Sequence, residues 1–427
     1  MSTQVELLVY NIGQLLTLDG PSGPRRGVAM RDLGLIENGA VAITSGQIVA
    51  TGASRALRGE YRAKRELDAG GRVVLPGFVD PHTHLPWAGD RADEFAMRIG
   101  GATYMQIMAA GGGIVRTVTS TRAATLAELV AETRGRLAVM LAYGTTTAEA
   151  KTGYGLNVEA ELKQLEAIAE LQGSQPVDLV PTFLGAHAVP AEYAGRTDAY
   201  VKILIDEMLP AGAQRWEDLR TRFPAGWPHF CDVFCEDGAF DLAQSQAILE
   251  AGRRLGFGLK IHVDEFAPLG GTPLAVRLGA ISVDHLVTTP ASHLDQLAAS
   301  NTIGVALPGT PFGLAQRDYS PARALIERDG ALALATDLNP GTCWCESMQF
   351  VIALACRYMR LTPEEAICAA TLNAAHAVGV GDRVGSLTPG KQADLLILDA
   401  ANYRMLGYRF GTNLVATVIK RGQVVLG

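Results

Sequence analysis

The stretch Gly77-Phe-Val-Asp-Pro-His-Thr-His84 joins an apolar run to two histidines that stand two positions apart. The apolar run before the turn predicts a buried β-strand over residues 75–79. Because alternate residues of an extended chain point to the same side, His82 and His84 can offer their imidazoles to one ion. This spacing, directly after a strand, favours a metal site over two unrelated packed histidines.

The middle of the chain repeats the same pattern of an apolar strand followed by a helix-length amphipathic segment. Such alternation is typical of βα units around a parallel sheet. The predicted strands are 75–79, 145–150, 179–186, 230–235, 258–263, 281–286, 303–307 and 331–336. This number of units favours a closed (β/α)8 TIM-like barrel.

Helix start signals support the segments between these strands. Thr125 with Glu128 has the spacing of a capping box, Asp241 opens another helix with Gln244, and Pro363 stands at the first position of a third. These signals predict helices that begin after residues 125, 241 and 362.

Both ends of the chain differ from the middle. Short strand-like runs lie at 7–10, 40–44, 47–50 and 73–75, and again at 393–399, 414–419 and 424–425. The sequence therefore predicts β-rich ends over residues 1–75 and 386–427, flanking a barrel over residues 76–385.

Composition describes a packed globular enzyme. Hydrophobic residues make up 48% and charged residues 19% of the 427 residues, and the net charge of −7 is spread along the chain. These features argue against a nucleic-acid or membrane partner and favour a small molecule. With no signal-peptide pattern and six scattered cysteines, a cytoplasmic protein with reduced thiols is expected.

Ionisable residues recur where the predicted strands end, which is where barrel enzymes build their active sites. They are His187, Glu236, His262, Glu265, His285 and Asp337. We assign one divalent metal, Zn²⁺ or Fe²⁺, to three histidines and one carboxylate, a set that leaves room for water. The assigned ligands are His82, His84, His262 and Asp337. Packing roles are expected for His229, His293, His376, Cys343 and Cys345.

Taken together, the His-x-His after the first strand, Val-Asp-Glu265 after the fifth and Thr-Asp337 after the eighth resemble the amidohydrolase superfamily. The resemblance implies that both chain ends form a small composite β-sandwich beside the barrel. The absence of a lysine at the end of the fourth strand, where Cys235 and Glu236 stand, disfavours the two-metal branch of that superfamily.

Within the superfamily, local strings resemble the imidazolonepropionase family. They are Ala88–Phe95, Gly111–Ile114, Lys151–Leu156, Leu184–His187 and Asp337–Thr342. Pro86-Trp87 and Cys343-Trp-Cys345 depart from that family's pattern and could alter substrate fit. The resemblance implies a homodimer and an anionic substrate held by Arg91, Tyr104, Tyr154, His187, Glu265, Asn339, Gly341 and Thr342.

The implied reaction is hydrolysis of the ring C–N bond of 4-imidazolone-5-propanoate to N-formimidoyl-L-glutamate in histidine degradation. The catalytic residues would be Asp337, His285 and Glu265, and the separate roles of the last two stay open. Two other hypotheses are a deaminase of a nucleobase or related cyclic amidine, which releases ammonia, and a barrel that serves only as a binding scaffold. The presence of every expected ligand weighs against the scaffold.

Overall fold

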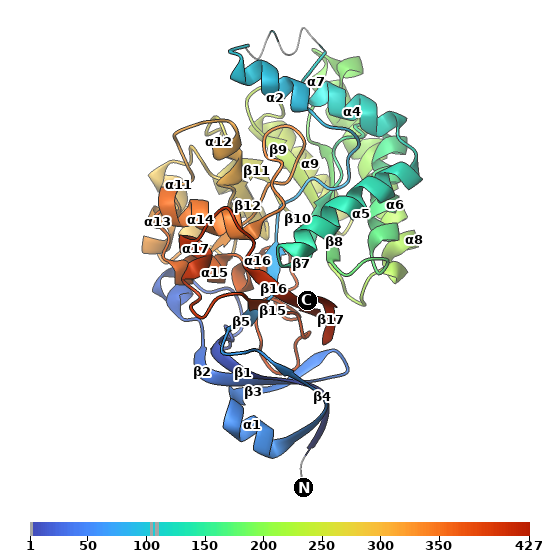
Figure 1. The fold of residues 1–427 in the computed structure, drawn as a ribbon. Coiled ribbons are helices and arrows are strands. Elements are labelled where there is room, and N and C mark those ends of the chain that lie inside the picture. The colour runs from blue at the N-terminus through green and yellow to red at the C-terminus, as the bar shows by residue number, and fades with distance from the viewer. Residues whose placement is uncertain (1–2, 103–105, 107–110) are drawn as a thin grey trace.

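The computed structural model describes residues 3–102, 106 and 111–427. Within this part of the chain the strands form two hydrogen-bonded sheets, one from the middle of the sequence and one from its two ends. Figure 1 shows the N-terminal strands at one end of the molecule and the barrel at the other. The predicted barrel with a separate β unit built from both termini is confirmed.

The barrel sheet consists of parallel strands in the order β14-β13-β12-β11-β9-β8-β7-β6, with β10 paired to β9. Its strands are β6 Phe78–Asp80, β7 Thr145–Lys151, β8 Asp178–Ala186, β9 Phe230–Cys235, β10 Gly258–Leu259, β11 His262–Val263, β12 Ser282–His285, β13 Ile303–Ala306 and β14 Leu332–Leu334. The predicted strand 258–263 is thus divided into two short pieces, β10 and β11. The predicted strand 75–79 also spans two strands, because residues up to Pro76 belong to the other sheet.

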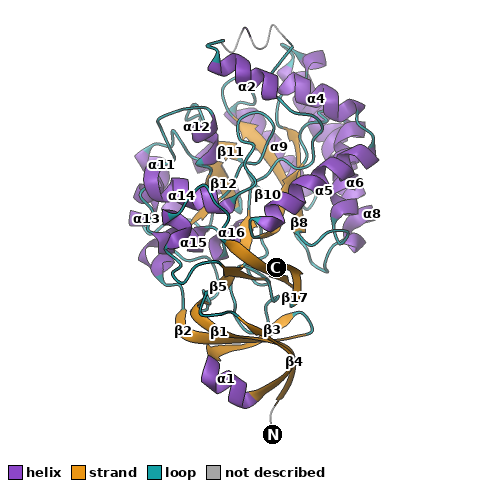
Figure 2. Ribbon diagram, in the orientation of Figure 1, coloured by secondary structure: helices purple, strands orange, loops and turns teal. Residues whose placement is uncertain are grey.

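Helices surround the barrel, most of them along the outside of its strands (Figure 2). They are α2 Ala92–Ile99, α4 Ile114–Ala123, α5 Leu126–Ala142, α6 Val158–Leu171, α7 Thr197–Ile203, α8 Leu209–Leu219, α9 Leu242–Arg254, α10 Gly271–Leu278, α11 Ala291–Ala298, α12 Gly309–Gly313, α13 Ala322–Glu327, α14 Met348–Tyr358, α15 Pro363–Ala369 and α16 Leu372–Ala377. The capping boxes at Thr125, Asp241 and Thr362 are all present, which confirms the three predicted helix starts.

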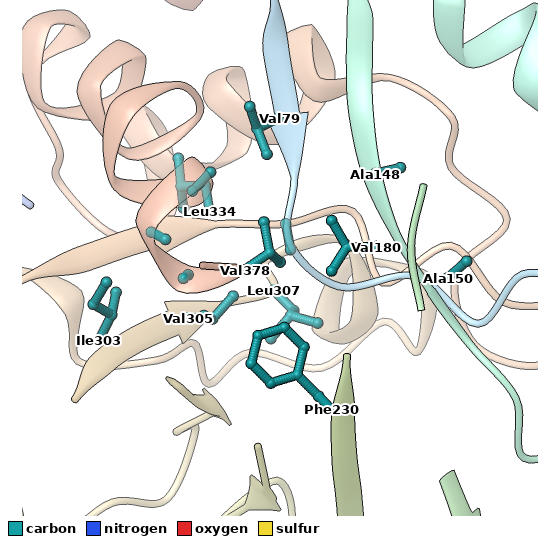
Figure 3. Close-up of a cluster of buried hydrophobic side chains, with 14 of the residues drawn as sticks. Val79, Ala148, Ala150, Val180, Phe230, Ile303, Val305, Leu307, Leu334 and Val378 are labelled. Atoms are coloured by element: carbon teal, nitrogen blue, oxygen red, sulfur yellow. The ribbon is translucent and has the colours of Figure 1, made fainter. Parts of the chain in front are cut away.

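The barrel strands are buried on both faces, as a parallel sheet covered by helices requires. Side chains from opposite parts of the barrel meet in one apolar cluster that includes Val79, Val180, Phe230 and Val305 (Figure 3). This core fixes the strands, so the loops at their carboxyl ends start from defined positions.

The second sheet joins the two ends of the chain. Its strands are β1 Thr3–Leu16, β2 Leu35–Thr44, β3 Gln47–Ala53, β4 Tyr61–Asp68, β5 Val73–Pro76, β15 Leu395–Leu398, β16 Val415–Lys420 and β17 Gln423–Leu426. Strand β5 pairs in parallel with β1 and antiparallel with β15, so it connects the N-terminal and C-terminal strands. Two short helices, α1 Ser54–Glu60 and α17 Met405–Tyr408, accompany these strands. The domain boundaries after residues 75 and 385 stay a prediction.

Candidate metal centre and active site

The first and last barrel strands meet directly at the predicted metal site. The Asp337 N–H donates to the His82 carbonyl over 3.1 Å, and the His84 N–H donates to the Leu338 carbonyl over 3.0 Å. These two backbone hydrogen bonds place the His-x-His segment beside Asp337. The positions of His82 and His84 are therefore fixed by the contact between the first and last barrel strands.

The side-chain atoms of the four assigned ligands converge. The Nε2 atom of His84 lies 3.3 Å from Nε2 of His82, 3.4 Å from Nε2 of His262 and 3.3 Å from Oδ1 of Asp337. His82 Nε2 lies 3.5 Å from the same Asp337 oxygen. Ligand atoms placed tetrahedrally at about 2.0–2.1 Å from one ion stand roughly 3.3–3.4 Å apart, so these spacings suit a single divalent ion.

Carboxylates behind the histidines determine which ring nitrogen faces the centre. Asp284 Oδ2 lies 2.7 Å from His82 Nδ1, and Asp232 Oδ1 lies 3.1 Å from His262 Nδ1. Each carboxylate accepts a hydrogen bond from the Nδ1–H group, which leaves the Nε2 lone pair directed at the site. Both aspartates are fully buried within strands β12 and β9.

Two buried lysines balance these carboxylates. Lys151 Nζ lies 2.6 Å from Asp232 Oδ2 and 2.9 Å from Glu149 Oε2, and Lys260 Nζ lies 3.1 Å from the same glutamate oxygen. The side chains are completely inaccessible to solvent, so each charge requires a partner. Lys151 thus lies behind the metal centre as a structural charge.

Electrostatics keep the ligand imidazoles neutral. Burial lowers the pKa of His82 and of His84 well below the usual range, and the Lys151 ammonium lowers both further. Burial likewise lowers the pKa of His262 to about 4, although Asp232 opposes this shift. Neutral imidazoles have the free lone pair that metal binding needs.

The surroundings of one buried oxygen, Oδ1 of Asp337, favour a bound cation. Asp337 Oδ1 accepts no hydrogen bond from the described residues and faces the imidazole nitrogens, whereas its Oδ2 accepts from the Thr310 hydroxyl. A buried carboxylate oxygen without a donor is costly unless a cation completes it. The residues present therefore fit a divalent metal.

His285 and Glu265 lie next to the cluster. The His285 ring centroid is 5.4 Å from that of His82, and its Nε2 lies 3.7 Å from Glu265 Oε2. Burial and the nearby Asp337 carboxylate raise the pKa of Glu265 well above its usual range. Together with His82 and His262, His285 also forms a group of potential ligands within 4.8 Å, so its assignment to catalysis stays a prediction.

Backbone strain accompanies these positions. His285, at the end of β12, has a φ of 79°, and Asp337, just after β14, has a φ of 56°. The left-handed region is costly for residues other than glycine, and such strain concentrates at functional sites.

Of the predicted substrate-binding residues, Arg91 directly precedes α2 and is held by Glu94 of that helix. Its Nη2 lies 2.7 Å from Glu94 Oε2, and its Nε donates to the same oxygen over 2.8 Å. Its Nη1 points toward Gly341, since a Cβ atom added to Gly341 would lie only 2.2 Å from this nitrogen. Arg91 and Gly341 are thus in close contact, and the absence of a side chain at residue 341 makes room for the guanidinium.

The predicted residues after β14 form one compact loop. Asn339 Oδ1 accepts from the backbone N–H groups of Gly341 and Thr342, each over 2.8 Å, and its Nδ2 donates to the Thr342 hydroxyl. A cavity of about 510 Å³ opens beside this loop and is also lined by Arg91 and Phe312.

Tyr154 and His187 lie against the metal ligands. The His187 ring stacks on that of His84 with centroids 4.7 Å apart, and Tyr154 lies 5.2 Å from His187. Glu161 of α6 fixes the turn at Tyr154 by accepting from the N–H groups of Gly153, Gly155 and Leu156. Tyr104, also predicted to bind substrate, lies outside the described residues.

Sequence reasoning missed the residues behind the ligands: Glu149, Asp232, Lys260, Asp284 and Thr310. A signal was present, because Asp232 in Phe230-Cys-Asp-Val-Phe-Cys235 and Asp284 in the run 281–286 are charges inside apolar strands. A charged residue there must be paired.

Several predicted roles concern residues outside the cluster. The His229 ring stacks on Trp216 with centroids 4.6 Å apart, and neither it, His293 nor His376 belongs to a potential metal group within the described ranges. Glu236 accepts from the N–H groups of Phe266 and Ala267, so it holds the loop after β11.

A buried cluster of histidines and an aspartate at the carboxyl end of a (β/α)8 barrel, with a second sheet from both termini, defines an amidohydrolase. Residues 237–425 match the model of the amidohydrolase family. The chain is 58% identical to the imidazolonepropionase of Herpetosiphon aurantiacus, over 98% of this chain and 96% of that protein. It is 53% identical to that of Chloroflexus aggregans, over 99% and 98% of the two chains. The chain belongs to the imidazolonepropionase family of the amidohydrolases.

Solved structures show the same fold at low identity. A zinc-bound adenosine deaminase from Xanthomonas campestris has a TM-score of 0.69 and 19% identity, covering 100% of this chain and 94% of that one. A triazine hydrolase variant has a TM-score of 0.75 and 17% identity, covering 98% and 94%. At such identity the likeness concerns the fold alone.

Proposed function

We propose that this chain hydrolyses the ring C–N bond of 4-imidazolone-5-propanoate to N-formimidoyl-L-glutamate, a step of histidine degradation. The observation that carries the proposal is the 58% identity over 98% of the chain to an imidazolonepropionase. Buried groups of potential metal ligands, His82 with His84 and Asp337 and His82 with His262 and His285, support it. One water molecule is added, and one ring C–N bond breaks.

His82, His84, His262 and Asp337 would hold the ion. A divalent metal bound there supplies Lewis-acid activation, which lowers the pKa of a water molecule from about 16 to about 7. Zn²⁺ and Fe²⁺ both suit the nitrogen and oxygen ligands. The choice between them, the homodimer and the cytoplasmic location stay predictions.

The remaining residues would move the protons. Asp337 accepts the proton of the attacking water and passes it to the leaving ring nitrogen. Neutral His285, whose pKa burial lowers to about 3, steadies the developing oxyanion. Glu265, kept protonated by burial, donates a hydrogen bond to the ring.

The propionate would be recognised at the other end of the site. Arg91 offers its Nη1 to the carboxylate while Glu94 fixes the opposite edge of the guanidinium. The Tyr154 hydroxyl assists Arg91, and His187 lies against the ring. Asn339, Gly341 and Thr342 belong to the loop that Arg91 contacts at Gly341.

The test follows the ultraviolet absorbance of enzymatically generated imidazolone propionate. Metal-loaded protein should remove this absorbance, and EDTA should stop the reaction until Zn²⁺ or Fe²⁺ is returned.

Arg91→Lys should raise KM at least about 10-fold, because an ammonium cannot replace a guanidinium fork, and Asp337→Asn should abolish turnover. The control is Arg116→Lys, at an exposed ion pair with Asp93. If the absorbance stays unchanged with metal-loaded protein and ammonia is released from a cyclic amidine, the chain is a deaminase and the proposed function is wrong.

A further inference from the structure

Two loops of the active site meet through a pair of tryptophans. Trp87 lies after the His-x-His segment and Trp344 lies after Thr342. Their rings pack edge to face, with centroids 5.2 Å apart and planes at 87°. Trp87 is fully buried, whereas Trp344 is 46% exposed. The contact thus connects the loop after β6 to the loop after β14.

Arg136 of α5 packs against both rings of this pair. Its Cζ lies 3.8 Å from the Trp87 ring centroid and 5.3 Å from that of Trp344. Its Nη1 donates to the Trp87 carbonyl over 2.8 Å, and its Nη2 lies 2.8 Å from Glu132 Oε2. Glu132 in turn accepts from the Gly89 N–H over 3.3 Å. One helix therefore holds both the backbone of residues 87–89 and the tryptophan pair.

The segment so held separates the two ends of the site. Residues 85–90 connect His84, a proposed metal ligand, to Arg91, the proposed carboxylate partner. On the opposite loop, the Asn339 N–H donates to the Cys343 carbonyl over 2.9 Å, so the position of Trp344 is coupled to the loop that starts at Asp337. Arg91 and Gly341, which belong to the same two loops, are also in contact.

We propose that Arg136, with Trp87 and Trp344, is a positioning unit that sets the separation between Arg91 and the metal ligands and thereby the fit of the substrate's anionic chain. This inference rests on the proposed function for its choice of substrate. A planar guanidinium is required, because it stacks on one ring while forming directed hydrogen bonds to a carbonyl and a carboxylate.

The test combines kinetics with hydrogen exchange in the metal-loaded full chain. Trp344→Ala and Arg136→Lys should each raise KM about 10-fold and change kcat less than about twofold, because Arg91 is displaced while the metal ligands remain. Trp344→Phe should keep KM near that of the wild type, since it retains an aromatic edge contact. Amide exchange should accelerate in both 85–91 and 339–345 in Trp344→Ala, although only one loop is altered.

A matched control is available at another arginine over a tryptophan. Arg383 Cζ lies 5.6 Å from the Trp227 ring, and Arg383 also donates to the Ala225 carbonyl, away from the site. Arg383→Lys should leave KM unchanged. A KM within twofold of the wild type for both Trp344→Ala and Arg136→Lys, or faster exchange in 339–345 alone, would overturn the proposal. If the wild type itself does not turn over the substrate, the proposed function fails, and the exchange experiment still decides whether the two loops are coupled.

Discussion

Single carboxylates decide which nitrogen each buried histidine presents to the metal centre. Asp284 and Asp232 accept hydrogen bonds from the Nδ1–H groups of His82 and His262, and both carboxylates are balanced by lysines. Removing one such carboxylate leaves the ligand in place but frees its tautomer and its orientation. Removal of the carboxylate should therefore lower the affinity for the metal, and not only the stability of the fold.

Asp284→Asn is therefore expected to weaken metal binding about 10- to 100-fold. Competition with a chromophoric chelator measures this affinity directly. The matched control is Asp178→Asn, a buried aspartate that pairs with Lys420 and touches no metal ligand. This control should lose stability but keep the affinity of the wild type. Equal metal affinity in Asp284→Asn and the wild type would refute the orienting role.

His229 should make stability depend on pH. Burial lowers its pKa from the ordinary 6.5 to about 4, so the folded state favours the neutral ring. Between pH 6.5 and pH 4 the unfolded chain then binds more protons, and stability falls as the pH is lowered through that window. The wild type should lose up to about 1.5 kcal/mol more than His229→Gln between pH 7 and pH 5, measured by urea unfolding. An equal loss in both proteins would contradict this account.

At the scale of elements, the barrel and the terminal sheet are joined by a buried ion cluster. Lys420 at the end of β16 places its Nζ 2.8 Å from Asp178 Oδ2 of β8 and 2.7 Å from Asp394 Oδ2. It also donates to the Thr146 carbonyl of β7 over 2.7 Å. Removing this cation would leave the buried Asp394 carboxylate without an ion pair, whereas Asp178 would keep its ion pair with Arg421.

Lys420→Met is expected to destabilise the protein by about 3 kcal/mol, because an unpaired buried carboxylate is costly. The control is Lys202→Met, at an exposed pair with Asp206 whose side chains are 75% and 50% accessible. Such a pair contributes at most about 1 kcal/mol. Chemical unfolding measures the free energy of unfolding of the two variants. Similar decreases in both would show that the buried cluster stabilises the protein no more than the exposed ion pair does.

The sequence predicted those elements whose pattern is regular. Strand β9 was located at both ends, because apolar residues of a buried strand are bounded by polar turns. Strand β4 was missed because Tyr61–Asp68 is rich in charged residues, and its alternating apolar side chains, Tyr61, Ala63 and Leu67, are only partly buried. The break between β10 and β11 was missed because Lys260 and Ile261 remain buried, and burial alone does not reveal a lost strand pairing.

Site residues could be predicted from the sequence only where a potential metal ligand or catalytic side chain follows a predicted strand. The two histidines at 82 and 84 are separated from Asp337 by most of the barrel, yet the strand-end pattern brings them together. The pairing of Arg91 with Glu94, and the contact of Trp87 with Trp344, depend on side-chain directions in loops. No periodicity in the sequence encodes those directions.

For the whole molecule, the ion would close the barrel. Among the described residues, β6 and β14 are joined next to the site by an isolated bridge between Thr83 and Leu338, not by a continuous ladder. The proposed ligands come from the β6 end, from β11 and from the β14 end, so one ion connects the first, fifth and last barrel strands. Without it, the Asp337 oxygen and three imidazole lone pairs face one another unpaired.

Metal removal should therefore destabilise the entire barrel, not only its activity. An ion present at about 1,000 times its Kd stabilises the folded state by about 4 kcal/mol, because it binds the native cluster and not the unfolded chain. Calorimetry should show a melting temperature several degrees lower after chelation and its recovery with Zn²⁺. His293→Ala, outside the cluster, should keep this shift, whereas His262→Ala should lose it. If chelated and loaded wild type melt at the same temperature, the barrel is closed by the protein alone, and the ion would serve chemistry without serving the fold.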